Sequence, residues 1–357
     1  MHPAMSRFWS RLTHDLMPYS PGEQPRIDGL VKLNTNESPY GPSPQVLAAL
    51  RAGATDSLRL YPDPQSSALR VALATYHGMK PEQVFVGNGS DEVLAHVFAA
   101  LLKQDGPLLF PDITYSFYPV YCRLFGIVHE TVPLDAGLRV RVEDYRRPVG
   151  ALILPNPNAP TGIALKRAEI VALLEMHPQA PVVIDEAYVD FGAETAIPLV
   201  ADYPNVLVVQ TMSKSRALAG LRVGYAIGNA ALIEGLNRVK DSFNSYPLGR
   251  LAQAGAIASL EDEAWFQHTR RRVIEGRVRL ARRLSELGLE VLPSSANFVF
   301  ARHPDHKGAD LAAALRERAV IVRHFQSPRI ADYLRITVGT DAQIETLLSV
   351  MAEILGV

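Results

Sequence analysis

Short apolar runs alternate along the chain with longer stretches in which apolar residues recur at helical spacing. Each run is apolar on both faces, which is typical of parallel strands that helices cover on either side. The order strand, helix, strand, helix predicts an α/β fold whose site lies at the carboxyl ends of the strands. The predicted strands occupy residues 84–87, 108–110, 151–154, 182–184 and 206–209.

Helices are predicted between these strands. Ser90 precedes the helical stretch 91–104 and has the residue type of an N-cap, and two acidic residues follow it in the first turn. Residues 166–176 and 230–240 show similar patterns. The alternation of helices with buried strands indicates a large domain with a mostly parallel central sheet.

The C-terminal third has a different pattern. From Asp262 to Leu287 apolar residues recur every seven positions, so one long amphipathic helix is predicted there, ending before Gly288. The strand-like segments NFVFA and LRITVG and helices near 308–318 and 341–355 follow it. These elements predict a smaller α+β domain.

The first 42 residues show little periodicity and are rich in Pro, Gly and Asn, so they are predicted to form an extended arm. The predicted division has three parts. Residues 1–50 form the arm and part of the small domain, 51–258 the large cofactor-binding domain, and 259–357 the small C-terminal domain.

Composition narrows the class of protein. Lys and Arg total 36 against 37 Asp and Glu, a balance that argues against nucleic-acid binding. No apolar run reaches the ~18 residues of a membrane span, and the N-terminal segment lacks the apolar core of a signal peptide. The single cysteine, Cys122, excludes an intrachain disulfide and fits a reducing, cytoplasmic location. His303 and His306 lack a third ligand, so no metal site is predicted.

Two strand ends carry candidate chemistry. Lys214 is the one lysine of seven that directly follows a buried apolar strand. In a pocket, a lysine of lowered pKa can form a Schiff base, although a lysine just after a strand is more often solvated. Asp185 ends the strand VVID, where it would either cap the chain or pair with a cationic heterocycle. Tyr188, three residues later, could donate a hydrogen bond into the same space.

The segment VGNGSDE, residues 86–92, favours an anion site. A strand that runs through a glycine turn into a helix presents free N–H groups and the positive end of the helix dipole. Glu92 occupies the third glycine position of a dinucleotide fingerprint, so a phosphate on a smaller group fits better. Arg222, flanked by small residues, could approach that phosphate, although a capped helix and a surface arginine explain the same residues.

Together these segments resemble class II pyridoxal-phosphate (PLP) aminotransferases of fold type I. TMSKSRALAGLR matches the family's lysine segment, and GNGSDE, NPNAPTG and VVIDEAYVDF stand in the family's order. PYSPG, LNTNESPYGPSP, RLYPDP and SSANFV resemble the histidinol-phosphate aminotransferase subgroup. The resemblance implies PLP as the cofactor and a homodimer with shared active sites.

The resemblance also implies a role for each matching residue. Lys214 would hold PLP and move the proton at the substrate Cα, while Asp185 would pair with the pyridinium nitrogen. Tyr188 would bond the phenolic oxygen, and Asn158 is assigned a second bond because Ala159 stands where many relatives have asparagine. Tyr115 would stack on the ring, and the phosphate would contact Gly89, Ser90, Asp91, Ser213, Arg222 and, from the neighbouring subunit, Tyr61.

Substrate anions complete the implied site. Arg335 matches the family's carboxylate-binding arginine, Arg323 would be a second cation or a surface ion pair, and Tyr19 and Asn36 would close the pocket. The implied reaction converts L-histidinol phosphate and 2-oxoglutarate into imidazole acetol phosphate and glutamate, in histidine biosynthesis. Alternatives are an aromatic amino-acid aminotransferase, a phosphothreonine decarboxylase-like enzyme and a non-catalytic PLP-binding module. The incomplete glycine fingerprint disfavours a nucleotide-binding oxidoreductase.

Overall fold

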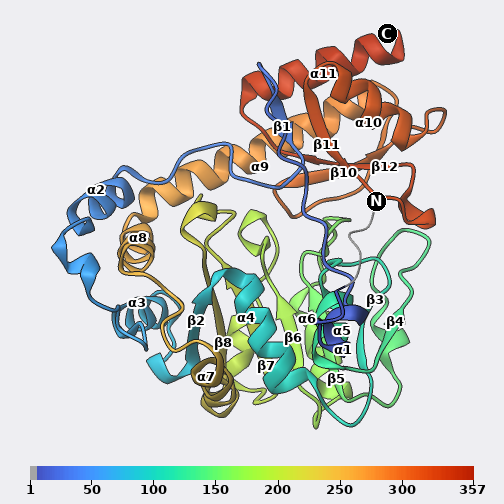
Figure 1. The fold of residues 1–357 in the computed structure, drawn as a ribbon. Coiled ribbons are helices and arrows are strands. Elements are labelled where there is room, and N and C mark those ends of the chain that lie inside the picture. Colours follow the sequence, from blue (N-terminus) through green and yellow to red (C-terminus); the bar gives the residue numbers. More distant parts are fainter. Residues whose placement is uncertain (1–5) are drawn as a thin grey trace.

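Two β-sheets organise the protein, and the computed structural model describes residues 6–357 (Figure 1). The larger sheet has seven strands, and all its neighbouring strands run parallel except β8, which is antiparallel to β2 and β7. The expected mostly parallel sheet is therefore confirmed. In spatial order the strands are β2 (Val84–Asn88), β8 (Val223–Gly228), β7 (Val206–Thr211), β6 (Val182–Asp185), β5 (Ala151–Pro155), β3 (Leu108–Pro111) and β4 (His129–Val132).

Strands β4 and β8 were not predicted, and each lacks the continuous apolar run of the others. β4 lies at the sheet edge with its first three residues exposed, so its sequence is polar. β8 contains Gly224, where a Cβ would lie 2.3 Å from the backbone nitrogen of Ser90. A glycine is required there because the start of α4 (Gly89–Val97) packs directly on the strand.

Helices cover both faces of this sheet, and the strand residues alternate between two cores. Along β6, Val182 and Ile184 enter one core and Val183 enters the other. The first core is covered by α2 (Pro44–Gly53), α3 (Ser67–His77), α6 (Arg167–Met176) and α8 (Arg250–Glu261). The second is covered by α4 (Gly89–Val97), α5 (Tyr118–Phe125) and α7 (Ala230–Phe243).

The smaller sheet has five strands and its own core. Its helices are α9 (Glu263–Glu286), α10 (Gly308–Glu317) and α11 (Asp341–Leu355). Figure 1 shows α9 running from α8 to this sheet, and Phe266, Val273 and Leu280 of the predicted apolar face are buried. The strands are, in spatial order, β1 (Val31–Leu33), β11 (Val320–His324), β12 (Tyr333–Thr337), β10 (Phe298–Arg302) and β9 (Glu290–Val291).

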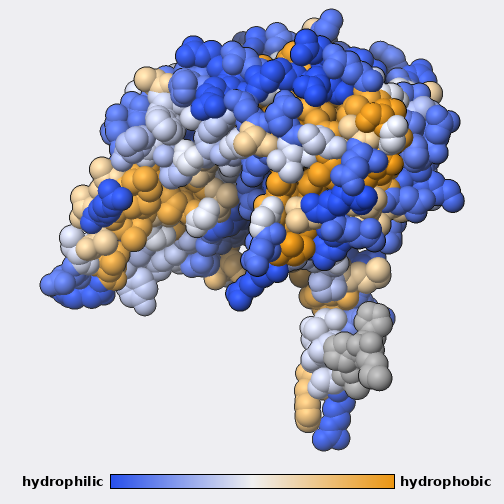
Figure 2. Space-filling view, turned by 90° about the horizontal axis from the view of Figure 1, so that it is seen from above, coloured by the Kyte–Doolittle hydropathy of each residue, from blue (hydrophilic) through white to orange (hydrophobic). Residues whose placement is uncertain are grey.

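The N-terminal segment is only partly the extended arm that the sequence indicated. It contains the short helix α1 (Arg11–Asp15), and β1 pairs in parallel with β11 inside the smaller sheet. Residues 1–5 lie outside the described part of the chain. Seen from above, the segment that carries α1 projects from the body of the molecule (Figure 2). Across residues 6–357, no helix combines the length and apolar character that a membrane span requires.

Candidate active site

One cavity of about 260 Å³ lies where the strand ends of the large sheet face the smaller sheet. Pro155, Asp185 and Thr211, the last residues of β5, β6 and β7, all line it. Arg323 on β11 and Arg335 on β12 line the opposite side. The cavity therefore occupies the position at which an α/β sheet ordinarily binds its ligand.

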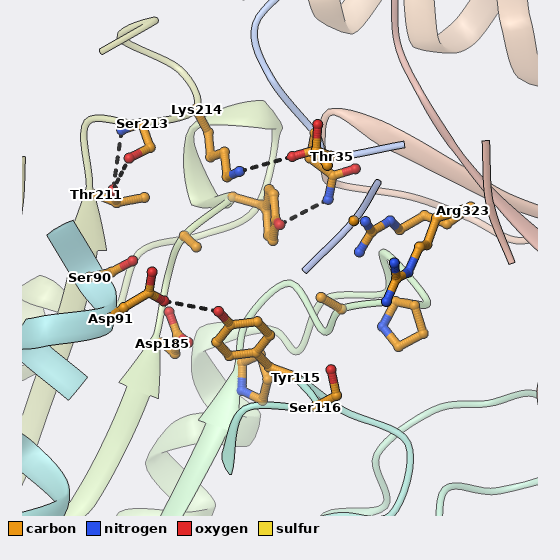
Figure 3. A pocket seen from close by; sticks show the side chains of 18 of the residues that line it. Thr35, Ser90, Asp91, Tyr115, Ser116, Asp185, Thr211, Ser213, Lys214 and Arg323 are labelled. Carbon is orange, nitrogen blue, oxygen red and sulfur yellow. Dashed lines mark hydrogen bonds between the residues drawn. The ribbon is translucent and has the colours of Figure 1, made fainter. Parts of the chain in front are cut away.

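Lys214 follows β7 by three residues and extends into this cavity (Figure 3). Its Nζ donates a hydrogen bond of 3.2 Å to the carbonyl oxygen of Thr35 and lies 6.0 Å from the ring centroid of Tyr188. The turn after it is anchored, because Ser215 donates to Asp190 and the buried Arg216 donates to the carbonyl of Ser259. The lysine therefore extends from a fixed turn into a space lined by other chain segments.

Asp185 is a buried carboxylate with one oxygen left without a partner. Its Oδ2 accepts a hydrogen bond of 2.8 Å from the Tyr118 hydroxyl, whereas Oδ1 meets no donor among the described residues. Burial raises the pKa of Asp185 to about 6. Buried polar atoms are ordinarily paired, so this oxygen at the cavity wall suits a cationic or protonated ligand atom.

The N-terminus of α4 forms one corner of the cavity, together with Ser213 and Arg222. The expected N-cap role of Ser90 is wrong, because α4 begins at Gly89 with Asn88 at the cap position. The positive φ of Gly89, 80°, allows the turn that starts the helix two residues earlier than expected. The hydroxyl of Ser90, which lines the cavity, is therefore not used as a helix cap.

Asp91 connects this corner to its neighbours. Its Oδ2 lies 3.2 Å from Nη2 of Arg222, and its Oδ1 accepts a hydrogen bond of 2.9 Å from the Tyr115 hydroxyl. The Tyr121 hydroxyl donates to the backbone oxygen of Asp91 at 2.7 Å. Asp91 thereby orients a guanidinium beside the helix N-terminus, where both favour a bound anion.

Two arginines form a second cationic corner. Arg323 and Arg335 are directly opposite each other on antiparallel strands β11 and β12. Nη2 of Arg335 donates to the carbonyl of Asn34 at 2.9 Å, but its buried Nε meets no partner among the described residues. Burial lowers the pKa of Arg335. Like charges in direct cross-strand contact are unfavourable, so the pair favours an anionic ligand between the two sheets.

Aromatic side chains close the remaining wall. Tyr19 from the N-terminal segment and Tyr115 both line the cavity, with ring centroids 6.3 Å apart. Tyr188 and Asn36 line it as well, and Nδ2 of Asn36 donates a hydrogen bond of 2.9 Å to the Tyr188 hydroxyl.

Three predicted residues, Gly89, Asn158 and Tyr61, are not among those that line this cavity. Nδ2 of Asn158 donates to the carbonyl of Ile113 and to the Thr161 hydroxyl, and Ala159 lines the cavity instead. Nδ2 of Asn158 therefore holds the loop behind the cavity, whereas its Oδ1 meets no partner among the described residues. The expected contact of Asn158 with the cofactor stays a prediction. Tyr61 is 78% exposed and stacks on Tyr246 at 4.8 Å, also outside the cavity.

Sequence reasoning missed Tyr118, Thr35 and Thr211. Tyr118 is the first residue of α5, and Tyr115 lies in the turn before it, with the two ring centroids 5.6 Å apart, so the aromatic stretch that holds both was an available signal. Thr211 ends β7 just before Ser213, as a polar residue after an apolar run. The contact between Thr35 and Lys214 joins residues 179 positions apart, and nothing local indicates it.

Comparison with known proteins places this site in a family. Residues 28–351 match the family model of aminotransferase class I and II. Histidinol-phosphate aminotransferase 1 of Bradyrhizobium diazoefficiens is 66% identical over 351 residues, which cover 98% of this chain and 100% of that protein. Histidinol-phosphate aminotransferase 2 of Rhizobium meliloti is also 66% identical, with the same coverage of 98% and 100%. The crystal structure of histidinol-phosphate aminotransferase from Sinorhizobium meliloti in complex with pyridoxal-5'-phosphate gives a TM-score of 0.87 at 25% identity over 99% of both chains. The chain belongs to the class I and II aminotransferase family.

Proposed function

We propose that this protein is a PLP-dependent aminotransferase that exchanges the amino group between L-histidinol phosphate and 2-oxoglutarate, in histidine biosynthesis. The observation that carries this proposal is the arrangement on one cavity wall. The ammonium of Lys214, the unpaired oxygen of Asp185 and the N-terminus of α4 face a single space. The relatives of this name, which match the chain from end to end, support the choice of substrates.

The residues present fit PLP. Asp185 Oδ1, buried and unpaired, would hold the ring nitrogen protonated, and a cation there would lower the pKa of Asp185 again. Ser90, Ser213 and Arg222 would bind the phosphate, with Gly89 and Asp91 shaping that corner and Tyr115 stacking on the ring. When bound, PLP supplies an electron sink for the negative charge at the substrate Cα. Lys214 would hold the cofactor and carry the Cα proton on Nζ.

The cationic corner formed by Arg323 and Arg335 suits the proposed substrates. Histidinol phosphate has a phosphate and no carboxylate, whereas glutamate has two carboxylates. A guanidinium can form paired hydrogen bonds with either anion, so Arg323 and Arg335 would bind the distal anion of each substrate in turn. Tyr19 would cover the bound substrate from the N-terminal segment.

Steady-state rates test this proposal. We expect the purified protein, supplied with PLP, to show an absorption band near the visible range and to transaminate histidinol phosphate with 2-oxoglutarate. Phenylalanine and threonine phosphate should react far more slowly. A faster reaction with phenylalanine would favour the aromatic aminotransferase, and carbon dioxide release from threonine phosphate would favour the decarboxylase.

We further propose that the protein works as a homodimer in the cytoplasm. The exposed Tyr61 lies in a loop held by Arg250, whose Nη2 donates to the Tyr61 carbonyl oxygen. The N-terminal segment carries the exposed apolar side chains of Phe8, Leu12 and Met17, which suit contact with a second copy. Tyr61 would then contact the cofactor phosphate of the neighbouring site. We also propose that the chain divides into three parts, residues 1–50, 51–258 and 259–357, as the sequence predicts.

Mixing two defective chains tests the shared site. Tyr61→Phe should weaken PLP binding by about 0.5–3 kcal/mol, the range of one hydrogen bond. In a heterodimer with Lys214→Ala, one site carries both defects and the other carries neither, so that second site should recover wild-type behaviour. Absence of complementation after confirmed subunit exchange would show that each site is built from one chain.

A further inference from the structure

Asn36 lies at the cavity wall with all the polar groups of its backbone and side chain in use. It is 1% exposed. Its backbone nitrogen donates to the Thr337 hydroxyl at 3.0 Å, and its carbonyl accepts from Nδ2 of Asn297 at 2.9 Å. Its side-chain Oδ1 accepts from Thr337 at 3.0 Å, and its Nδ2 donates to Tyr188 at 2.9 Å. Only the second N–H of Nδ2 has no hydrogen bond to the described residues, so most of the polar groups of Asn36 act on its neighbours.

The Thr337 hydroxyl fixes which way the amide of Asn36 faces. The hydroxyl already accepts the Asn36 backbone N–H, and Oδ1 of Asn36 takes its proton. Turning the amide around would leave that buried hydroxyl proton without an acceptor, at a cost of about 1–3 kcal/mol. Nδ2 of Asn36 is therefore directed at Tyr188, and Asn36 acts as a donor to it.

This direction decides where the proton of Tyr188 points. The Tyr188 oxygen accepts from Asn36, so its own single proton must be donated elsewhere. The described residues form no hydrogen bond that accepts it, and Tyr188 lines the cavity. The ring itself is held edge-on against Phe298, with centroids 5.2 Å apart and planes at 88°. The hydroxyl proton is therefore available to a ligand in the cavity.

The loop that contains Asn158 and Ala159 supplies no side-chain donor to the cavity, which makes the Tyr188 hydroxyl more important. Nδ2 of Asn158 is committed to Ile113 and Thr161, and Ala159, which lines the cavity, has no side-chain donor. Tyr188 is thus left to supply the hydrogen bond that an amide of this loop could otherwise provide.

We propose that Asn36, oriented by Thr337, is a positioning residue that commits the Tyr188 proton to the phenolic oxygen of the cofactor. This inference rests on the proposed function. The N–H bond from Asn36 also polarises the Tyr188 hydroxyl, because hydrogen bonds in a chain strengthen one another. Asn36 acts through Tyr188 and needs no contact with cofactor or substrate.

Asn36→Asp reverses the direction of this hydrogen bond with little change of shape. The φ of 57° at this position is one that Asp tolerates, and a carboxylate oxygen facing Tyr188 would accept its proton. The variant therefore withdraws the donor from the cavity. Asn34→Asp is the matched control, because it adds the same charge to the same wall and its side chain donates only to Glu23.

The measurement compares the dissociation constants of the cofactor-free protein for PLP and for 3-deoxypyridoxal phosphate, which lacks the phenolic oxygen. Wild type and Asn34→Asp should prefer PLP, and Asn36→Asp should lose that preference by about tenfold or more. In a Tyr188→Phe background the substitution should change the preference no further. Equal weakening of both ligands by Asn36→Asp would overturn the inference and leave Asn36 a structural residue.

A second pair of variants tests the same inference if the Asn36→Asp protein does not fold. Thr337→Val removes the hydroxyl that orients the amide, whereas Thr337→Ser keeps it. Thr337→Val should shift the ligand preference in the same direction as Asn36→Asp, and Thr337→Ser should not. If wild type fails to bind PLP at all, the proposed function itself is wrong. If wild type prefers PLP and neither variant alters the preference, only the inference fails.

Discussion

The Tyr118 hydroxyl and Asp185 form a fully buried pair in which the tyrosine occupies Oδ2 and leaves Oδ1 to the cavity. The Tyr118 ring packs edge-on against Tyr115, with centroids 5.6 Å apart, and against Phe110 at 5.8 Å. The orientation of the carboxylate is therefore set by the packed core between β6 and α5.

Tyr118→Phe should keep the fold and impair the site. It removes a buried hydrogen bond to a charged group, which contributes about 1.5–3 kcal/mol, so kcat/KM should fall about ten- to a hundredfold. The Tyr118 hydrogen bond lowers the pKa of Asp185 against the effect of burial, so its loss should move the acidic limb of the pH–rate profile to higher pH. An unchanged profile would show that Tyr118 does not tune Asp185.

Lys214→Ala should abolish transamination while the protein remains folded. The corner proposed to hold the phosphate is intact in this variant, so PLP should still bind without covalent attachment. Borohydride treatment followed by peptide mass analysis should locate the cofactor on Lys214 in wild type and on no residue in the variant. Lys103→Ala, at an exposed lysine, is the control and should behave as wild type.

Gly89→Ala should damage both stability and the phosphate corner. A Cβ at this position would lie 2.4 Å from Nη2 of Arg222, and the φ of 80° disfavours any side chain. We expect a loss of about 1–2 kcal/mol in unfolding free energy and weaker PLP binding. Gly220→Ala, where a Cβ meets nothing within 4 Å, should change neither in urea unfolding and PLP titration.

Glu186 should make the stability of the cofactor-free protein fall as pH rises. Burial raises its pKa to about 7 although Thr195, Ala196 and Gln210 donate to it. Between the unfolded pKa of about 4.3 and this value the folded state binds more protons, so unfolding free energy decreases with pH, by on the order of 3 kcal/mol in total.

The variant Glu186→Gln isolates this contribution. Burial lowers the pKa of His77 to about 4, and that shift makes stability rise with pH over part of the same window. The difference between wild type and Glu186→Gln removes the histidine contribution. From pH 4 to 7 the unfolding free energy of Glu186→Gln should therefore rise steadily relative to that of wild type. A pH-independent difference would show that Glu186 is ionised throughout.

The sequence predicted those parts of the site that depend on local position. Asp185 and Lys214 follow apolar strands, so the topology alone brings them to one edge of the sheet. The pairing of Tyr118 with Asp185 spans 67 residues, and that of Asn36 with Thr337 spans 301, so both depend on tertiary packing. The motif around Asn158 gives the order of residues and does not give the side to which each one turns, so it did not show that the cavity is lined by Ala159.

The arginine pair has a thermodynamic consequence. Arg323 and Arg335 face each other across β11 and β12, and without an anion their repulsion works against the smaller sheet. Any dianion that fits between them and binds the folded chain alone raises the free energy of unfolding by RT ln(1 + [L]/Kd), and the melting temperature rises with it. Melting curves in phosphate, succinate and chloride at matched ionic strength would therefore rank which anions this pair was selected to hold.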